Sequence, residues 1–170
     1  ITRNQGTGTI SDPSGIFEFI DIEGSYTTGP QGVGGSMTYY LGYRVGSSEP
    51  SSYTFTSDSA GSAAYSARVL RIKGMKATGD RYGNVVQNAN ANDTYAMADS
   101  ITVTAPNSLI FRFYSIDTEA VSNVDARDIA IYHDGYLSAV GHGCGMRYGP
   151  KTGNTGHRTA DLAAADDWLA

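Results

Sequence analysis

The residues of this chain best suited to metal binding or nucleophilic chemistry are three histidines and one cysteine. Of these, only two lie close together, as His142-x-Cys144, while His133 and His157 stand apart. A zinc site needs three or four ligands in a tetrahedral arrangement, and no CxxC or HxxxH spacing supplies the missing ones. We therefore predict no metal site here, but a glycine-bracketed strand that carries a buried thiol and a surface imidazole.

Carboxylates gather in two segments that the pattern places in loops. They are Asp117, Glu119, Asp125 and Asp128 in the first and Asp161, Asp166 and Asp167 in the second. Such loops are able to bind calcium weakly, but the DxDxDG spacing of a calcium loop is missing. We interpret both groups as solvated surface charge.

Enzymatic motifs are missing as well. Serine catalysis on an α/β-hydrolase requires a GxSxG elbow, and the chain has none. Phosphate-binding loops require GxxxxGK[ST], or GxGxxG between a strand and a helix, and neither pattern is found in the glycine-rich residues 26–36. We predict that the protein is not an enzyme, has no catalytic residue and uses no cofactor.

Charge and hydropathy exclude two classes of partner. The net charge is −5, and the 12 Lys and Arg residues are scattered, which argues against nucleic-acid binding. No apolar run has the length of a membrane helix, and the first residues lack the apolar core of a signal peptide, so we expect a soluble protein without a membrane partner. Because position 1 is isoleucine, we expect a processed product or the ordered part of a longer protein.

Composition points to strands and turns. The 170 residues suit one domain, and 21 glycines, 12 tyrosines and a charged fraction of only 17% are unfavourable for helices. The clearest pattern is residues 37–56, where apolar and polar residues alternate up to Val45, a Gly-Ser-Pro turn follows, and Tyr53 begins a second strand. These residues predict a hairpin.

Further strands are predicted at steady spacing. Single strands are predicted for residues 16–22 and for residues 63–72, with 69–72 as the buried end. A second hairpin joins residues 100–104 and 109–116 around Pro106-Asn107, and residues 128–132 and 136–140 flank the tight turn Asp134-Gly135. A last strand contains Trp168, for which a short helix is the alternative. Residues 74–92 predict a long polar loop. The fold class is all-β, a two-sheet antiparallel β-sandwich of jelly-roll type, with an extended polar arm in residues 1–14 and one domain in residues 15–170.

Tyrosine is the residue type best suited to contact with another molecule. Tyr39 and Tyr43 lie on the alternating apolar face and are expected in the core. Four others are predicted contact residues, one on the opposite strand face and three in loops: Tyr40, Tyr82, Tyr95 and Tyr148. Tyrosine serves both sugar binding and subunit interfaces, so both remain open.

Three segments resemble a known family: YYLGYRVGSSEPSSYTFT, RVLRIKG and SITVTAPNSLIFRFYSI. Their alternating strands and Glu-Pro turn are similar to β-sandwich domains of tailed-bacteriophage virion proteins. The resemblance implies a jelly-roll component located in the virion, either a capsid decoration (cement) protein or part of a tail or fibre, that contacts other virion proteins. We predict a homotrimer, with the arm of residues 1–14 ordered by an adjacent subunit.

Two other functions fit the same fold. The first is a carbohydrate-binding module or host-glycan adhesion domain, in which loop tyrosines stack on sugars. The second is a polysaccharide lyase or hydrolase.

Overall fold

Every regular element that the structure describes is a β-strand. The computed structural model describes residues 1–4, 10–20, 26–28, 35–46, 48–57, 64–75, 83, 89–116, 121–126, 128–137, 140–149 and 151–170. The strands pair antiparallel in several sheets, an arrangement consistent with a β-sandwich, so the predicted all-β class is confirmed. Within these residues, no helix is long and apolar enough to cross a membrane.

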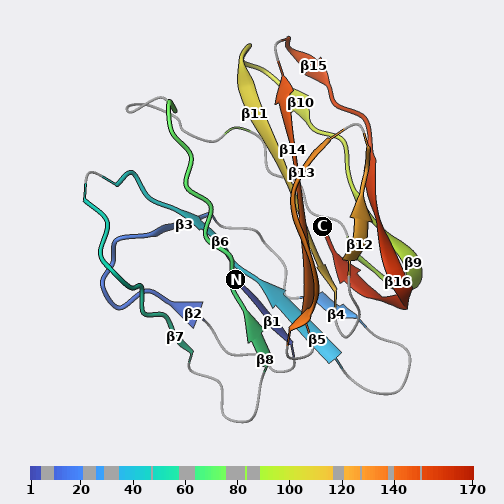
Figure 1. The fold of residues 1–170 in the computed structure, drawn as a ribbon, viewed down its shortest axis with the longest axis horizontal. Coiled ribbons are helices and arrows are strands. Elements are labelled where there is room, and N and C mark those ends of the chain that lie inside the picture. Colours follow the sequence, from blue (N-terminus) through green and yellow to red (C-terminus); the bar gives the residue numbers. More distant parts are fainter. Residues whose placement is uncertain are drawn as a thin grey trace.

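The N-terminal half of the chain forms one four-stranded sheet and two strand pairs (Figure 1). The sheet has the order β4-β5-β1-β8, and the pairs are β2-β7 and β3-β6. The strands are β1 (Thr2–Asn4), β2 (Ile10–Ser11), β3 (Glu18–Ile20), β4 (Tyr26–Thr28), β5 (Gly35–Tyr39), β6 (Leu41–Tyr43), β7 (Thr56–Ser57) and β8 (Ala64–Ser66).

The beginning of the chain is paired within its own fold. In β1, Thr2 lies opposite both Tyr39 of β5 and Ser66 of β8, so both edges of this strand are hydrogen-bonded. The backbone N–H of Tyr40 also donates to the carbonyl of Ile1 at 2.7 Å, and β2 pairs with β7. Strands of the same chain therefore satisfy backbone groups in the described part of residues 1–14, while the ordering of this arm by an adjacent subunit stays a prediction.

Residues 37–56 contain strands but not the predicted hairpin. The first run is divided at Tyr40 into β5 and β6, and β6 pairs with β3, where Leu41 lies opposite Ile20. Of the second run only Thr56 lies in a strand, and this strand pairs with β2. Between these two parts of residues 37–56, Glu49 accepts a hydrogen bond from the Tyr53 hydroxyl and lies 3.8 Å from Arg44. Glu49 thus contacts residues on both sides of the predicted turn.

Aromatic rings hold β3 and the segment before β7 together. The ring of Phe17 lies 5.1 Å from that of Tyr53 and 5.4 Å from that of Phe55, and Phe19 also contacts Phe55 at 6.4 Å. Pairs at these separations add to the stability gained by burial. Since Phe17 and Phe19 both contact Phe55, they share one side of their segment.

The turn that leads into β3 is organised by Asp12. Its carboxylate accepts backbone hydrogen bonds from Ile16 at 2.7 Å and from Phe17 at 2.9 Å, and it also accepts the hydroxyl and N–H of Ser14. The Ser14 hydroxyl is the largest of the hydrogen bonds that lower the pKa of Asp12 to about 2. The turn is thus adapted to the charged carboxylate.

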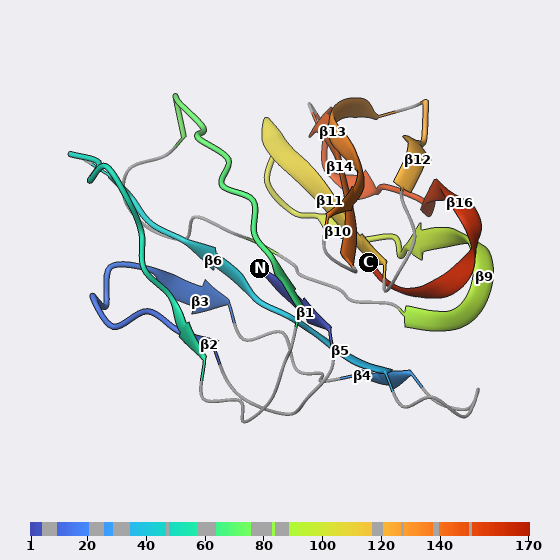
Figure 2. The same ribbon diagram turned by 60° about the horizontal axis from the view of Figure 1, so that its bottom comes forward.

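The C-terminal half forms a six-stranded sheet and one further pair. The sheet has the order β12-β16-β11-β14-β13, with β9 also paired to β16, and β10 pairs with β15. The strands are β9 (Ala89–Ala98), β10 (Thr102–Val103), β11 (Ser108–Ile116), β12 (Val121–Val124), β13 (Ile129–Leu137), β14 (Val140–Gly149), β15 (Gly153–Asn154) and β16 (Arg158–Leu169). Figure 2 shows this sheet beside the N-terminal strands.

Three predictions in this half need correction. The strand of residues 109–116 exists, and a turn lies at Pro106-Asn107, where Asn107 has a φ of 60°. The two strands beside this turn do not pair with each other as predicted. Instead, β11 pairs with β14 and β16, and β10 pairs with β15. Asp134-Gly135 lies inside β13, and Leu137 opposite Val140 places the reversal after Leu137. Residues 89–92 of the predicted polar loop belong to β9, while most of residues 76–88 lie outside the described part.

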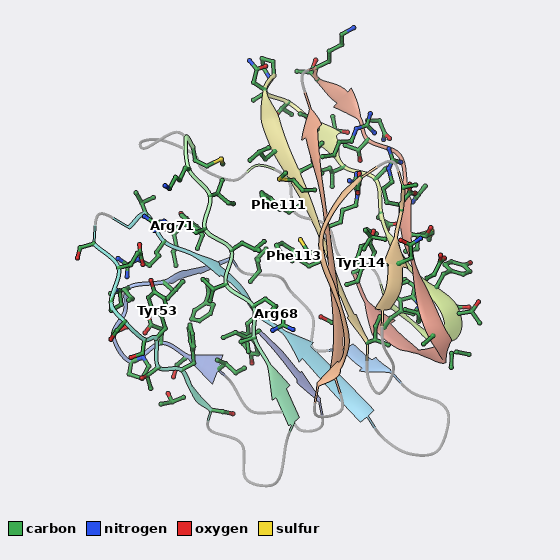
Figure 3. All side chains as sticks on the ribbon, viewed as in Figure 1. Tyr53, Arg68, Arg71, Phe111, Phe113 and Tyr114 are labelled. Atoms are coloured by element: carbon green, nitrogen blue, oxygen red, sulfur yellow. The ribbon has the colours of Figure 1, made fainter. Side chains whose placement is uncertain are left out.

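The two faces of β11 differ in burial, and this difference locates the core. Ile110, Arg112, Tyr114 and Ile116 are buried on one face, whereas Leu109, Phe111 and Phe113 are half-buried on the other. Figure 3 shows Tyr114 on the opposite side of β11 from Phe111 and Phe113. The buried face joins a core of Ala96, Ala98, Tyr114, Ile116, Val124, Ala160, Leu162 and Trp168. The predicted last strand with Trp168 is confirmed, and the helical alternative is wrong.

Candidate functional site

A buried ionic cluster of Arg112, Asp128 and Arg158 lies within the C-terminal sheet. Nη1 of Arg112 donates to Oδ2 of Asp128 at 2.8 Å, and Nε of Arg158 lies 3.7 Å from Oδ1 of the same carboxylate. The side chains are 3%, 1% and 5% exposed, respectively. The carboxylate of Asp128, which lies directly before β13, thus connects β11 with the start of β16.

The backbone positions Asp128 for this role. Its N–H donates to the carbonyl of Asp125 at 2.9 Å, and the N–H of Asp125 donates to the carbonyl of Thr159 at 2.9 Å, beside Arg158. On the other side, Gly145 lies opposite Arg112 in the register of β11 and β14. A Cβ at Gly145 would lie 3.2 Å from Oδ2 of Asp128, so glycine leaves the space that the carboxylate occupies.

Two weakly acidic groups lie in the same buried region. Burial raises the pKa of Tyr114 well above its ordinary value, and burial together with the charge of Asp128 raises the pKa of the Cys144 thiol to about 12. Because the thiolate is the nucleophilic form, this thiol is inert at neutral pH. The prediction that Cys144 is buried is confirmed, while the side chain of His142 lies outside the described part.

The cluster is suited to holding strands together. All three charged groups are enclosed, and buried groups of this kind are strongly coupled to the stability of the fold. Among the residues that the structure describes, no three His, Cys, Asp or Glu side chains form a group able to hold a metal ion.

Sequence reasoning missed this cluster, and the interpretation of Asp128 as solvated charge is wrong. A signal was available in β11, where Arg112 stands on the same strand face as Ile110 and Tyr114. A charged side chain on an otherwise apolar face requires a partner of opposite charge if that face is buried. The sequence does not indicate which of the carboxylates supplies that charge.

A second feature is the exposed segment, which we define as residues 67–75. It follows β8 and belongs to no strand of the structure. Val69 is 65% exposed, Ile72 41% and Met75 46%, so the prediction that residues 69–72 form the buried end of a strand is wrong. In both ribbon views the exposed segment runs between β6 and β11 (Figures 1 and 2).

Basic side chains alternate with these apolar ones. Arg68, Arg71 and Lys73 are exposed, which makes the exposed segment positively charged in a chain whose net charge is −5. Figure 3 shows Arg68 and Arg71 on this segment, on the side of β11 that carries Phe111 and Phe113. These two phenylalanine rings stack at 6.1 Å with an interplanar angle of 15°.

Of the four predicted contact tyrosines, Tyr40 and Tyr95 are the two whose side chains the structure describes, and they lie in different halves of the chain. Tyr40 is half-buried and its ring lies 6.3 Å from that of Phe19, so it packs within the N-terminal half. Tyr95 lies in β9 and not in a loop, but it is 45% exposed, as expected of a contact residue. Tyr148 lies in β14 and not in a loop, but its side chain lies outside the described part of the structure. The whole of Tyr82 lies outside the described residues.

Comparison of the chain with models of protein families, with curated proteins and with solved structures found no match.

Proposed function

We propose that the protein is a non-enzymatic structural component of a bacteriophage virion, either a capsid decoration protein or a tail-associated protein. In this proposal it stabilises the particle through contacts with other virion proteins and with copies of itself. The support comes from the resemblance of three segments to such domains and from the exposed segment. The proposed fold is a two-sheet jelly-roll sandwich, in which the sheet containing β1 and the sheet containing β11 form the two layers.

The exposure of Val69, Ile72 and Met75 is the observation that carries this proposal. Large apolar side chains exposed within one short segment are the kind of surface found at protein interaction sites. Burying each of them in an interface would contribute about 1.5–3 kcal/mol before the costs of association. The interleaved Arg68, Arg71 and Lys73 protect the same segment from indiscriminate aggregation.

A second copy of the chain is the partner that the charges favour. The exposed segment is basic and the protein as a whole is acidic, so electrostatic attraction would guide one copy toward another. A contact between two different surfaces forms a closed ring when the rotation closes, and a trimer is the ring we propose. The exposed segment is the subunit contact in this proposal.

The test is the oligomeric state of the wild type and of Val69→Asp combined with Ile72→Asp. We expect the wild type to sediment as a trimer and the double variant to associate at least about 100-fold more weakly, since it must bury unpaired charge. Val45→Asp is the matched control, because Val45 is 54% exposed and lies outside the exposed segment.

The control should sediment like the wild type. A wild type that remains monomeric at high micromolar concentration, or a double variant that still forms the trimer, would contradict the proposed contact.

A further inference from the structure

Three neighbouring strands of the C-terminal sheet present a row of polar side chains on their outer face. In β9, Ala96 is buried and Tyr95 is exposed; in β16, Ala160 and Leu162 are buried and Asp161 is exposed. The same alternation in β12 buries Val124 and exposes Asn123. The three exposed side chains therefore point away from the core.

The strand register places these three side chains next to one another. Asp161 lies opposite Tyr95 in the pairing of β16 with β9, and it lies opposite Asn123 in the pairing of β16 with β12. Side chains directly opposite each other have Cβ atoms about 4.5–5.5 Å apart, so the row is about 10 Å long. We call Tyr95, Asp161 and Asn123 the outer row.

The outer row has the chemistry to bind a sugar ring. A tyrosine ring offers an apolar face that the C–H groups of a pyranose can cover. The carboxylate of Asp161 can accept hydrogen bonds from two hydroxyl groups, and the amide of Asn123 can both donate and accept. A sugar ring has an apolar face and hydroxyl groups at its edge. The ring of Tyr95 can cover that face, while Asp161 and Asn123 can hydrogen-bond to the hydroxyl groups.

The local charge restricts which sugars fit. Asp93 lies two residues before Tyr95 in β9, and Asp161 lies opposite Tyr95 in β16, so two carboxylates belong to this part of the sheet. Two carboxylates at one surface repel phosphate, sulfate and sialic acid. A neutral glycan is the ligand that this charge favours.

The outer row lies away from the exposed segment. In both ribbon views β9 and β16 are on the side of the C-terminal half opposite the exposed segment (Figures 1 and 2). Subunit contacts through one surface would leave the other accessible.

We propose that Tyr95, Asp161 and Asn123 form a binding site for neutral glycans. This inference does not rest on the proposed virion function, because a monomer would carry the same row. Its ligand is a neutral hexose or N-acetylhexosamine ring, bound with its apolar face on Tyr95 and its hydroxyl groups on Asp161 and Asn123.

The experiment is binding of the wild-type chain to an array of neutral glycans terminating in hexose or N-acetylhexosamine, followed by calorimetry with the glycan that binds most strongly. We expect Tyr95→Ala to weaken binding at least about ten-fold and Tyr95→Phe to weaken it no more than about three-fold, since phenylalanine keeps the ring. Asp161→Asn, which keeps the shape but removes charge, should weaken binding at least about ten-fold, because a charged acceptor makes the stronger hydrogen bonds.

Val45→Ala, an exposed residue of the N-terminal half, is the control and should bind like the wild type. The proposal is overturned if no glycan on the array binds, or if Tyr95→Ala binds as well as the wild type. It is also overturned if Tyr95→Ala changes the sedimentation of the protein and leaves glycan binding unchanged, since the outer row would then be a protein interface.

Discussion

Replacing Asp128 with asparagine is expected to lower the free energy of unfolding by about 3–5 kcal/mol. The carboxylate is the counter-charge of both Arg112 and Arg158, and its side chain is only 1% exposed. Asparagine has nearly the same shape, so packing around Gly145 would be preserved while the opposing charge is lost. Both guanidinium groups would then lose their charged contact with Asp128 while remaining enclosed, and losing one partner of a buried ion pair is costly.

The measurement is urea denaturation followed by the fluorescence of Trp168, the single tryptophan of the chain and a buried residue. Asp161→Asn is the matched control, because it removes a carboxylate from an exposed position of the same sheet, and it should change stability by no more than about 0.5 kcal/mol. A loss below about 1 kcal/mol for Asp128→Asn would mean that the carboxylate does not hold the two arginines.

Replacing Trp168 with alanine is expected to cost about 3–5 kcal/mol. The side chain is 2% exposed and packs in the core with Tyr114 and Leu162, and it lies opposite Ile116 in the register of β11 and β16. Removing the indole would leave a cavity where four strands meet, and a rigid sheet cannot collapse to fill it.

Replacing Trp168 with phenylalanine separates the contribution of the aromatic volume from that of the indole N–H group. The Nε1 of Trp168 is buried and makes no hydrogen bond within the described residues, so Trp168→Phe loses volume but no polar partner. We expect it to cost less than half as much as Trp168→Ala in urea denaturation followed by far-ultraviolet circular dichroism. Equal costs for the two variants would show that the indole N–H has a partner.

Either loss would be a large part of the stability of a domain of this size, which is typically about 5–15 kcal/mol. The core of the C-terminal sheet and the ionic cluster are therefore expected to tolerate substitution poorly. The exposed segment and the outer row are surface features, and changes there should affect association or binding with little effect on folding.

Individual strands could be predicted from the sequence better than their partners. Alternation identified residues 109–116, because a half-buried strand imposes its period on the residues. The final strand with Trp168 was predicted without such a period, and a short helix was its alternative. The pairing of β11 with β14 and β16 depends on contacts between residues far apart in the chain, which local turn signals do not contain. Asp134-Gly135 illustrates this, since a favourable turn dipeptide lies inside β13, where tertiary contacts outweigh the local preference.

The candidate sites were predictable only in part. Tyr95 was predicted as a contact residue, and this stays a prediction, whereas its neighbours Asp161 and Asn123 become visible only through the strand register. The exposure of Val69 opposes the usual expectation for an apolar residue near a strand, and such exceptions depend on what the rest of the fold, or a partner, covers.

The most direct test of the proposed function is the copy number of the chain in purified virions of a phage that encodes it, measured by quantitative mass spectrometry. The proposal predicts that the chain is present in a fixed ratio to the major capsid or tail protein, in a copy number divisible by three. Particles that are purified intact and contain none of this chain would contradict it.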